Sequence, residues 1–219
     1  MDDIPHHYDV NSGISPLIQD GQWASFCALR PGEAFALSTS LRWDVGSKLA
    51  ADSCRTHPLS AVLDEEATFA QNYNSDHLTW LLQYHLGSAA AGCVSIQLIG
   101  TTVHLPNMTV DEMNTYAFVR CPHVCRGPQR KDILVDAQST PLSVAPFAVS
   151  FLFQLRERIK ACPARDEAFV SELVELFVDE AALFCRKCAH LMESDLARLG
   201  SNILDRVERD IAAVEIMRV

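Results

Sequence analysis

The sequence lacks a long uninterrupted apolar run. The closest candidate is residues 89–105, and polar side chains interrupt it, among them Ser95, Gln97, Thr101 and Thr102. A membrane-spanning helix needs roughly 18 or more consecutive apolar residues, so no membrane span is predicted. The first residues also lack the basic stretch and apolar run of a secretory signal. We therefore expect an intracellular protein, cytoplasmic or nuclear, whose cysteines are reduced thiols.

Motifs for nucleotide chemistry are also missing. The sequence has no phosphate-binding glycine loop, no dinucleotide fingerprint and no kinase signature. Basic residues are scarce, since 18 Lys and Arg face 28 Asp and Glu, which gives a net charge of −10. Nucleic-acid binding normally requires a basic face. It is not expected here, although a basic cluster in one predicted loop leaves contact with an acidic partner open: Arg120, Arg126, Arg130 and Lys131.

Lysine is the rarer basic residue, with four lysines against fourteen arginines. A GC-rich genome, such as that of some large DNA viruses, produces this bias, and it indicates nothing about function. What the sequence does contain is typical of a globular protein, with 48% apolar and 21% charged residues in a chain of 219. This length fits one large domain or one domain with an appendage.

The first part of the chain predicts mixed structure. Residues 1–21 indicate an irregular arm, and residues 22–140 a mixed α/β portion. Two short apolar runs, 23–29 and 34–43, predict two strands around a turn at residues 30–32, with a short helix as the alternative. Apolar residues at helical spacing predict one helix over 60–73 and a second from Asn74 through Leu86.

A small sheet is predicted next. Residues 93–105 are the best strand candidate, with a bulge or bend at Gly100. Thr109 and Glu112 have the spacing of a capping box, which predicts a short helix. Residues 116–120 and 132–136 are apolar runs of strand length. Together these segments predict a small antiparallel sheet.

The apolar pattern of residues 141–219 predicts a helical portion, which we expect to form one compact domain with residues 22–140. Its apolar residues predict helices over 144–161, over 166–192 and along the final stretch, where Gly200 either kinks the helix or separates two helices. The predicted fold class is therefore α+β, with a small antiparallel sheet and a helix-rich C-terminal half.

The final helix carries an apolar stripe that advances by three or four residues at each step, as one face of an amphipathic helix does. It consists of Leu196, Leu199, Ile203, Val207, Ile211 and Val214. Such a stripe packs either against its own domain or against another chain, because a helix bound in a groove uses the same spacing. We expect it to form the surface that binds a protein partner or a second copy of the chain.

Two groups of cysteine and histidine indicate a zinc site as an alternative. Cys121, His123 and Cys125 form one group, and Cys185, Cys188 and His190 form the other. A tetrahedral structural zinc ion takes four such ligands from two short segments. The predicted ligands are Cys121, Cys125, Cys185 and Cys188. The second pair lies within an apparently continuous helix, where residues three apart share a face, and burial as ordinary core thiols is the competing interpretation.

A cysteine hydrolase is the enzymatic alternative. Such enzymes need a thiolate that a histidine activates, with a third polar group orienting the histidine. Cys27, His104 and Asp111 supply these residue types. Cys27 lies in an apolar run, however, so a core position explains it equally well.

The sequence thus favours a non-enzymatic intracellular adaptor or assembly protein that uses its C-terminal helices and needs no cofactor. The cysteine hydrolase is the second hypothesis, and the zinc-stabilised interaction module is the third.

Overall fold

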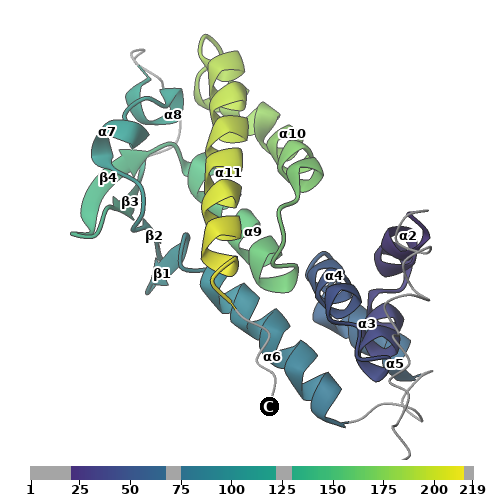
Figure 1. Cartoon of the computed structure of the whole chain (residues 1–219). Coiled ribbons are helices and arrows are strands. Elements are labelled where there is room, and N and C mark those ends of the chain that lie inside the picture. The colour runs from purple at the N-terminus through teal and green to yellow at the C-terminus, as the bar shows by residue number, and fades with distance from the viewer. Residues whose placement is uncertain (1–20, 68–74, 122–129, 215–219) are drawn as a thin grey trace, which may run out of the picture. The chain divides into compact units, whose positions relative to one another are not determined.

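The computed structural model of the chain describes residues 21–67, 75–121 and 130–214 (Figure 1). The described chain forms two compact units, one that ends at His85 and one that runs from Leu86. The predicted irregular arm lies almost entirely outside the described residues. No helix among the described residues is both long enough and apolar enough to cross a membrane.

The first unit is helical throughout its described part. Its elements are α2 (Gln22–Leu29), α3 (Pro31–Ser40), α4 (Asp44–Cys54), α5 (Leu59–Ala67) and the first part of α6 (Ser75–Gly92). Helices α5 and α6 confirm the two helices predicted for this region, although residues 68–74 lie outside the described chain. Helix α6 continues past the predicted end at Leu86.

The two strands predicted over 23–29 and 34–43 are wrong, because both segments are helices. Trp23 and Cys27 lie four residues apart and are both buried, which is the period of a helix face and not of a strand. Trp23 packs on Trp43, with ring centroids 4.8 Å apart. Pro31 occupies the first turn of α3, a position that the fixed proline φ favours in a helix. The apolar runs are too short for the spacing of their residues to distinguish a helix from a strand.

The second unit contains a four-stranded sheet in the order β1-β2-β3-β4. Its strands are β1 (Gln97–Ile99), β2 (Thr102–Leu105), β3 (Lys131–Val135) and β4 (Thr140–Val144). Pairs β1–β2 and β3–β4 are antiparallel, whereas β2 and β3 are parallel. The α+β class is confirmed, but the sheet is mixed and not purely antiparallel, because the chain between β2 and β3 crosses over through two short helices, α7 (Val110–Met113) and α8 (Ala117–Arg120).

Local signals were correct at some positions of this sheet and misleading at others. Gly100 adopts φ +62° between β1 and β2, a left-handed conformation that glycine tolerates. Thr109 caps α7 by accepting a hydrogen bond from the Glu112 N–H at 3.1 Å. The strand predicted over 116–120 is instead α8. Strand β4 was not predicted, because residues from 141 onward were assigned to the helical portion; its Pro141 is tolerated because β4 is an edge strand.

Three long helices complete the second unit: α9 (Pro146–Ala161), α10 (Glu167–Phe184) and α11 (Ala189–Ile211). The predicted helix over 166–192 is therefore two helices, separated by residues 185–188. Gly200 neither kinks α11 nor ends it. A Cβ at Gly200 would lie 2.6 Å from Val170 Cγ1, so glycine here permits α10 and α11 to pack closely.

The sheet and the C-terminal helices share one hydrophobic core. The division between the two compact units falls within α6, between His85 and Leu86. The apolar stripe of the last helix belongs to this core: Leu196, Leu199, Ile203, Val207 and Ile211 are buried, and Val214 is half-buried. These side chains pack within their own unit, so the expectation that they form an exposed partner-binding surface is wrong.

Candidate metal centre

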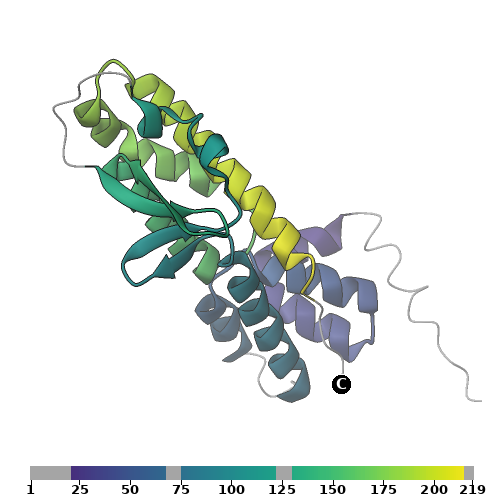
Figure 2. The same cartoon turned by 90° about the vertical axis from the view of Figure 1, so that its left-hand side faces the viewer.

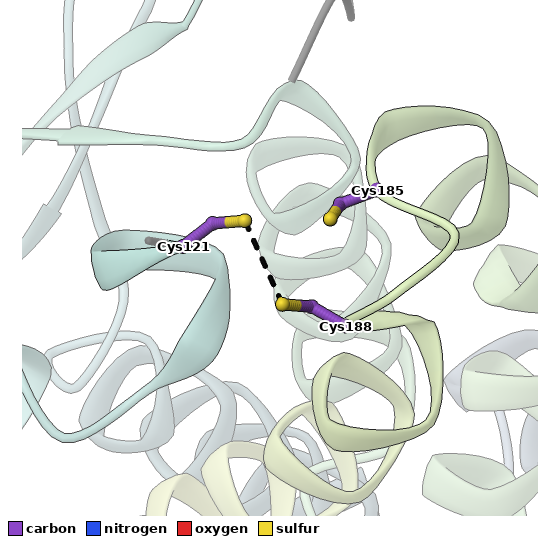
Figure 3. A group of neighbouring side chains, drawn as sticks. All are labelled: Cys121, Cys185 and Cys188. Atoms are coloured by element: carbon purple, nitrogen blue, oxygen red, sulfur yellow. Dashed lines mark hydrogen bonds between the residues drawn. The ribbon is translucent and has the colours of Figure 1, made fainter. Parts of the chain in front are cut away.

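Three cysteine side chains converge at one end of the second unit (Figure 3). Cys121 follows the last residue of α8, and Cys185 and Cys188 lie between α10 and α11. Their sulfur atoms all lie within 4.8 Å of one another. Cys185 and Cys188 are 7% and 3% exposed, and Cys121 is half-buried. Three of the four predicted metal ligands are therefore brought together.

The segment that carries Cys185 and Cys188 is a tight turn and not continuous helix, which corrects the sequence interpretation. Cys185 has extended backbone angles, φ −152° and ψ 98°, at the end of α10. The Cys188 N–H donates a hydrogen bond to the Cys185 carbonyl at 3.0 Å, and α11 begins at the next residue. Two cysteines on such a turn direct their thiols to the same side, as the paired ligands of structural zinc sites do.

The distance between two of the sulfurs matches that between two ligands of a tetrahedral metal ion. The thiol of Cys121 donates to the sulfur of Cys188 over 3.7 Å. Zinc–sulfur bonds of about 2.3 Å place the sulfurs of a tetrahedral site about 3.8 Å apart. A disulfide would require a sulfur–sulfur distance of about 2.05 Å. The two sulfurs thus lie at the separation of two ligands of one ion, and far beyond the length of a covalent bond between them.

Burial in the cluster opposes ionisation of the Cys188 thiol. Burial, followed by hydrogen bonding with Cys121 and Cys185, raises the pKa of Cys188 to about 12. Without a cation, the buried thiol thus stays protonated. A divalent metal ion reverses this preference, because thiolate ligands bind it in deprotonated form and neutralise its charge.

The segment that leads to Cys121 runs beside helix α11 (Figure 2), and a series of polar contacts joins the two. Arg206 pairs with Glu112 at 2.7 Å. Asn202 Nδ2 donates to the Tyr116 hydroxyl at 3.1 Å. These two contacts fasten the start of the segment to the C-terminal half of α11.

Further contacts continue toward the cysteines. The Arg198 guanidinium lies 4.6 Å from the centroid of the Tyr116 ring. The Ala117 N–H donates to Asp195 Oδ2 at 2.5 Å, at the start of α8. Cys121 and Cys188, which are 67 residues apart in sequence, form the last contact of this antiparallel series. Contacts with α11 therefore position the segment that leads to Cys121, and the turn before α11 carries the other two thiols.

The predicted fourth ligand, Cys125, lies outside the described residues, as does His123. His190 is exposed in the first turn of α11 and is not part of the cluster. The described residues thus bring three of the predicted ligands together, and Cys125 stays a prediction from the sequence.

Other cysteines show what an ordinary core position looks like in this chain. Cys27 and Cys162 are buried, and burial raises the pKa of Cys27 to about 11 and raises that of Cys162. Neither belongs to a group of potential metal ligands within the described part of the chain. Burial alone therefore does not explain why three thiols meet at Cys121.

The hydrolase hypothesis does not gain support. A thiol with its pKa raised to about 11 is almost entirely protonated near neutral pH, whereas a nucleophilic cysteine needs a lowered pKa. His104 Nε2 is hydrogen-bonded to the Asp136 carbonyl oxygen at 2.8 Å. Its Nδ1 is buried and has no hydrogen-bond partner among the described residues, so Asp111 does not orient the ring.

Sequence analysis missed the turn at residues 185–188 and the contacts that α11 makes with residues 112–121. The Cys-x-x-Cys spacing was a signal for the turn, since this spacing is common on metal-binding turns. The polar contacts left no signal, because they join residues 78 to 94 positions apart that no local pattern relates.

Comparisons with models of protein families, with characterised proteins and with solved structures give no significant match to this chain.

Proposed function

We propose that this chain is a non-enzymatic interaction module whose second unit is stabilised by a structural zinc ion bound to Cys121, Cys185 and Cys188. The observation that carries the proposal is the convergence of three thiols from two segments that are 67 residues apart in sequence. Thiolates are the ligands that zinc prefers in structural sites. Other soft metals also bind thiolates, so the identity of the ion is itself subject to the experiment.

A structural role fits the surroundings of the cluster better than a catalytic one. Catalytic zinc sites keep one coordination position open for water or substrate. Here Cys185 and Cys188 are buried among apolar side chains. No histidine or carboxylate joins the cluster among the described residues, so no general base is at hand to activate a bound water.

The ion would fasten two parts of the fold. One is the crossover between β2 and β3, whose described part ends at Cys121, and the other is the turn that joins α10 to α11. Metal binding contributes to folding free energy when the ligands come from segments that only the folded chain brings together. A clip across 67 residues also closes a long loop, which restricts the unfolded chain.

The proposal is tested by the metal content of the full chain, purified without chelator and measured by elemental analysis. We expect about one zinc ion per chain. Cys188→Ser should lose most of the zinc, because serine is a poor ligand for this ion. Cys162→Ser is the matched control, since Cys162 is also buried but lies in no cluster, and it should retain the zinc.

Cobalt substitution gives a second measurement that does not depend on folding yield. The cobalt(II) form of the full chain should show thiolate-to-cobalt charge-transfer absorption and the intense visible bands of a tetrahedral ion. Cys125→Ser tests the predicted fourth ligand in the same way, by changing that spectrum. Protein that contains no metal after growth in zinc-supplemented medium, or equal metal content in Cys188→Ser and wild type, would overturn the proposal.

A further inference from the structure

Exposed basic side chains surround the cysteine cluster. Arg186 and Lys187 occupy the two positions between Cys185 and Cys188, and both are exposed. Arg120 immediately precedes Cys121 and is also exposed. Because the sulfurs of these cysteines meet, their charged neighbours in the sequence are brought to the same end of the unit.

Arg130 adds a fourth positive charge, and its position is fixed. One guanidinium nitrogen donates to the Val119 carbonyl at 2.5 Å and to the Ser143 carbonyl at 3.0 Å. The guanidinium carbon lies 6.0 Å from the centroid of the ring of Phe184, the residue that directly precedes Cys185 in the sequence. We call Arg120, Arg130, Arg186 and Lys187 the basic rim.

The basic rim lacks the compensation that other arginines of the unit have. Five of these pair with a carboxylate at 2.5 to 2.8 Å: Arg156, Arg158, Arg165, Arg198 and Arg206. No residue of the basic rim forms an ion pair within the described part of the chain. Four neighbouring positive charges repel one another, so an anionic group placed among them is attracted. Zinc bound to the three cysteine thiolates of the cluster would carry a net charge of about −1, which balances only part of the rim.

Two exposed leucines flank the same turn. Leu183 lies two residues before Cys185 and is 81% exposed, and Leu191 lies three residues after Cys188 and is 58% exposed. Large apolar side chains beside uncompensated charges are typical of surfaces that bind proteins, where an apolar contact provides affinity and the charges select the partner.

The combination favours a protein partner over nucleic acid. Single-stranded bases stack on aromatic side chains, whereas the apolar residues exposed here are aliphatic and Phe184 is buried. The whole chain carries a charge of −10, which repels a long polyanion. A short acidic segment of a partner can contact the basic rim without approaching the acidic residues elsewhere in this protein.

We infer that the basic rim, together with Leu183 and Leu191, docks a segment of a partner protein that combines acidic residues with apolar side chains. This inference rests on the proposed function, since the zinc ion would hold the turn that presents the rim. The acidic residues of the partner contact Arg120, Arg130, Arg186 and Lys187, and its apolar side chains cover the two leucines. The rim selects the partner by charge, and contact with the leucines removes apolar area from water.

A displayed library of random peptides, selected against the full wild-type chain, tests this inference. We expect the enriched peptides to contain acidic residues beside leucine, isoleucine or phenylalanine. The affinity of an enriched peptide, measured by fluorescence anisotropy, should fall by on the order of tenfold in Arg186→Glu/Lys187→Glu, and it should weaken as salt concentration rises.

The matched control is Lys160→Glu/Arg209→Glu, which changes the net charge by the same amount at exposed positions of the same unit. It should bind the peptide like wild type. Zinc content and circular dichroism, measured on every variant, separate loss of binding from loss of fold. A duplex oligonucleotide provides the nucleic-acid comparison.

The inference is overturned if no peptides enrich, if enriched peptides are not acidic, if both double variants bind equally, or if the duplex binds more tightly than the peptides. These failures are distinguishable from failure of the proposed function. A chain that contains zinc but selects no acidic peptide refutes the docking surface alone. A chain without zinc that binds acidic peptides through Arg186 and Lys187 refutes the metal centre alone.

Discussion

Asp195 shows how one side chain positions the polypeptide next to the cluster. Its Oδ2 accepts the hydrogen bond from the Ala117 N–H at 2.5 Å, and its Oδ1 accepts one from Arg198 at 2.8 Å. The first N–H groups of a helix lack partners within that helix. Asp195 therefore satisfies a donor at the start of α8, four residues before Cys121.

We expect Asp195→Ala to lower the free energy of unfolding by about 1–3 kcal/mol, because a hydrogen bond to a charged group is lost and a half-buried N–H is left without its acceptor. Urea denaturation followed by circular dichroism measures this difference. Asp179→Ala, at an exposed position of α10, is the control and should change stability by less than about 0.5 kcal/mol. Equal effects of the two substitutions would show that Asp195 does not stabilise this region.

His85 predicts a pH dependence for the first unit. Burial lowers the pKa of His85 from its ordinary value of 6.5, and the nearby Arg55 charge acts in the same direction, although a hydrogen bond with the His57 carbonyl partly opposes them. The unfolded state thus binds the proton more tightly than the folded state does. The contribution of neutral His85 is fully present above pH 6.5 and decreases as the pH falls below that value.

The first unit should accordingly lose stability between pH 7 and pH 5. Replacement of His85 by glutamine, which does not titrate, should make this loss smaller. Urea denaturation monitored by tryptophan fluorescence is suitable, because Trp23 and Trp43 pack together in this unit. Identical pH dependences for wild type and His85→Gln would contradict the prediction.

The contact between α10 and α11 depends on the absence of a side chain at Gly200. Alanine in a helix is favoured over glycine by about 1 kcal/mol. A Cβ here would nevertheless lie 2.6 Å from Val170 Cγ1 and 3.2 Å from the Phe151 ring. Valine has little rotamer freedom in a helix, so the two helices would have to separate, and overpacking of this kind costs about 1–3 kcal/mol.

Gly200→Ala should therefore lower the free energy of unfolding by up to about 2 kcal/mol, because overpacking outweighs the better helix propensity of alanine. Thermal and urea denaturation measure the effect. Ser194→Ala, at an exposed position of the same helix, should be neutral or slightly stabilising. A stabilised Gly200→Ala variant would mean that the helices separate easily at this position.

Local sequence signals predicted those elements whose causes are local. Helices α9, α10 and α11 follow from apolar periodicity, and α7 follows from the cap at Thr109. Helix α2 was assigned as a strand because eight residues contain too few turns to show a helical period. Helix α8 is only four residues long, and its first N–H is satisfied by Asp195, which lies 78 residues away.

The candidate site was predictable in its chemistry but not in its geometry. Cysteine spacing identified all four predicted ligands, of which Cys121, Cys185 and Cys188 are described and do converge. The turn between Cys185 and Cys188 contains neither glycine nor proline, the residues that usually mark a break in a helix. The apolar stripe was assigned to a partner because periodicity gives the orientation of a helix face and not the identity of what covers it.

At the level of the entire chain, the two compact units should respond differently to loss of metal. The cysteine cluster lies in the second unit, and the described part of the first unit contributes no residue to it. If the proposed metal helps α11 to hold residues 112–121 and 185–192 together, chelation should loosen both segments. The helices of the first unit should be unaffected.

Hydrogen exchange followed by mass spectrometry measures this response segment by segment. We expect amide exchange in residues 112–121 and 185–192 to accelerate roughly tenfold or more after chelator treatment, because metal binding stabilises the closed state. Exchange in α4 should stay unchanged, and restoring zinc should reverse the effect. Uniform acceleration in both units would indicate that the chain unfolds as a whole, contrary to the prediction.

X-ray absorption at the zinc edge, recorded on the full chain purified without chelator, tests the metal centre most directly. The three converging thiols predict a four-coordinate ion whose nearest shell is mainly sulfur, at a zinc–sulfur distance of about 2.3 Å. Serine in place of Cys188 should remove this shell. An ion coordinated only by oxygen and nitrogen at about 2.0–2.1 Å, or protein that carries no zinc, would contradict the assignment of Cys121, Cys185 and Cys188 as ligands.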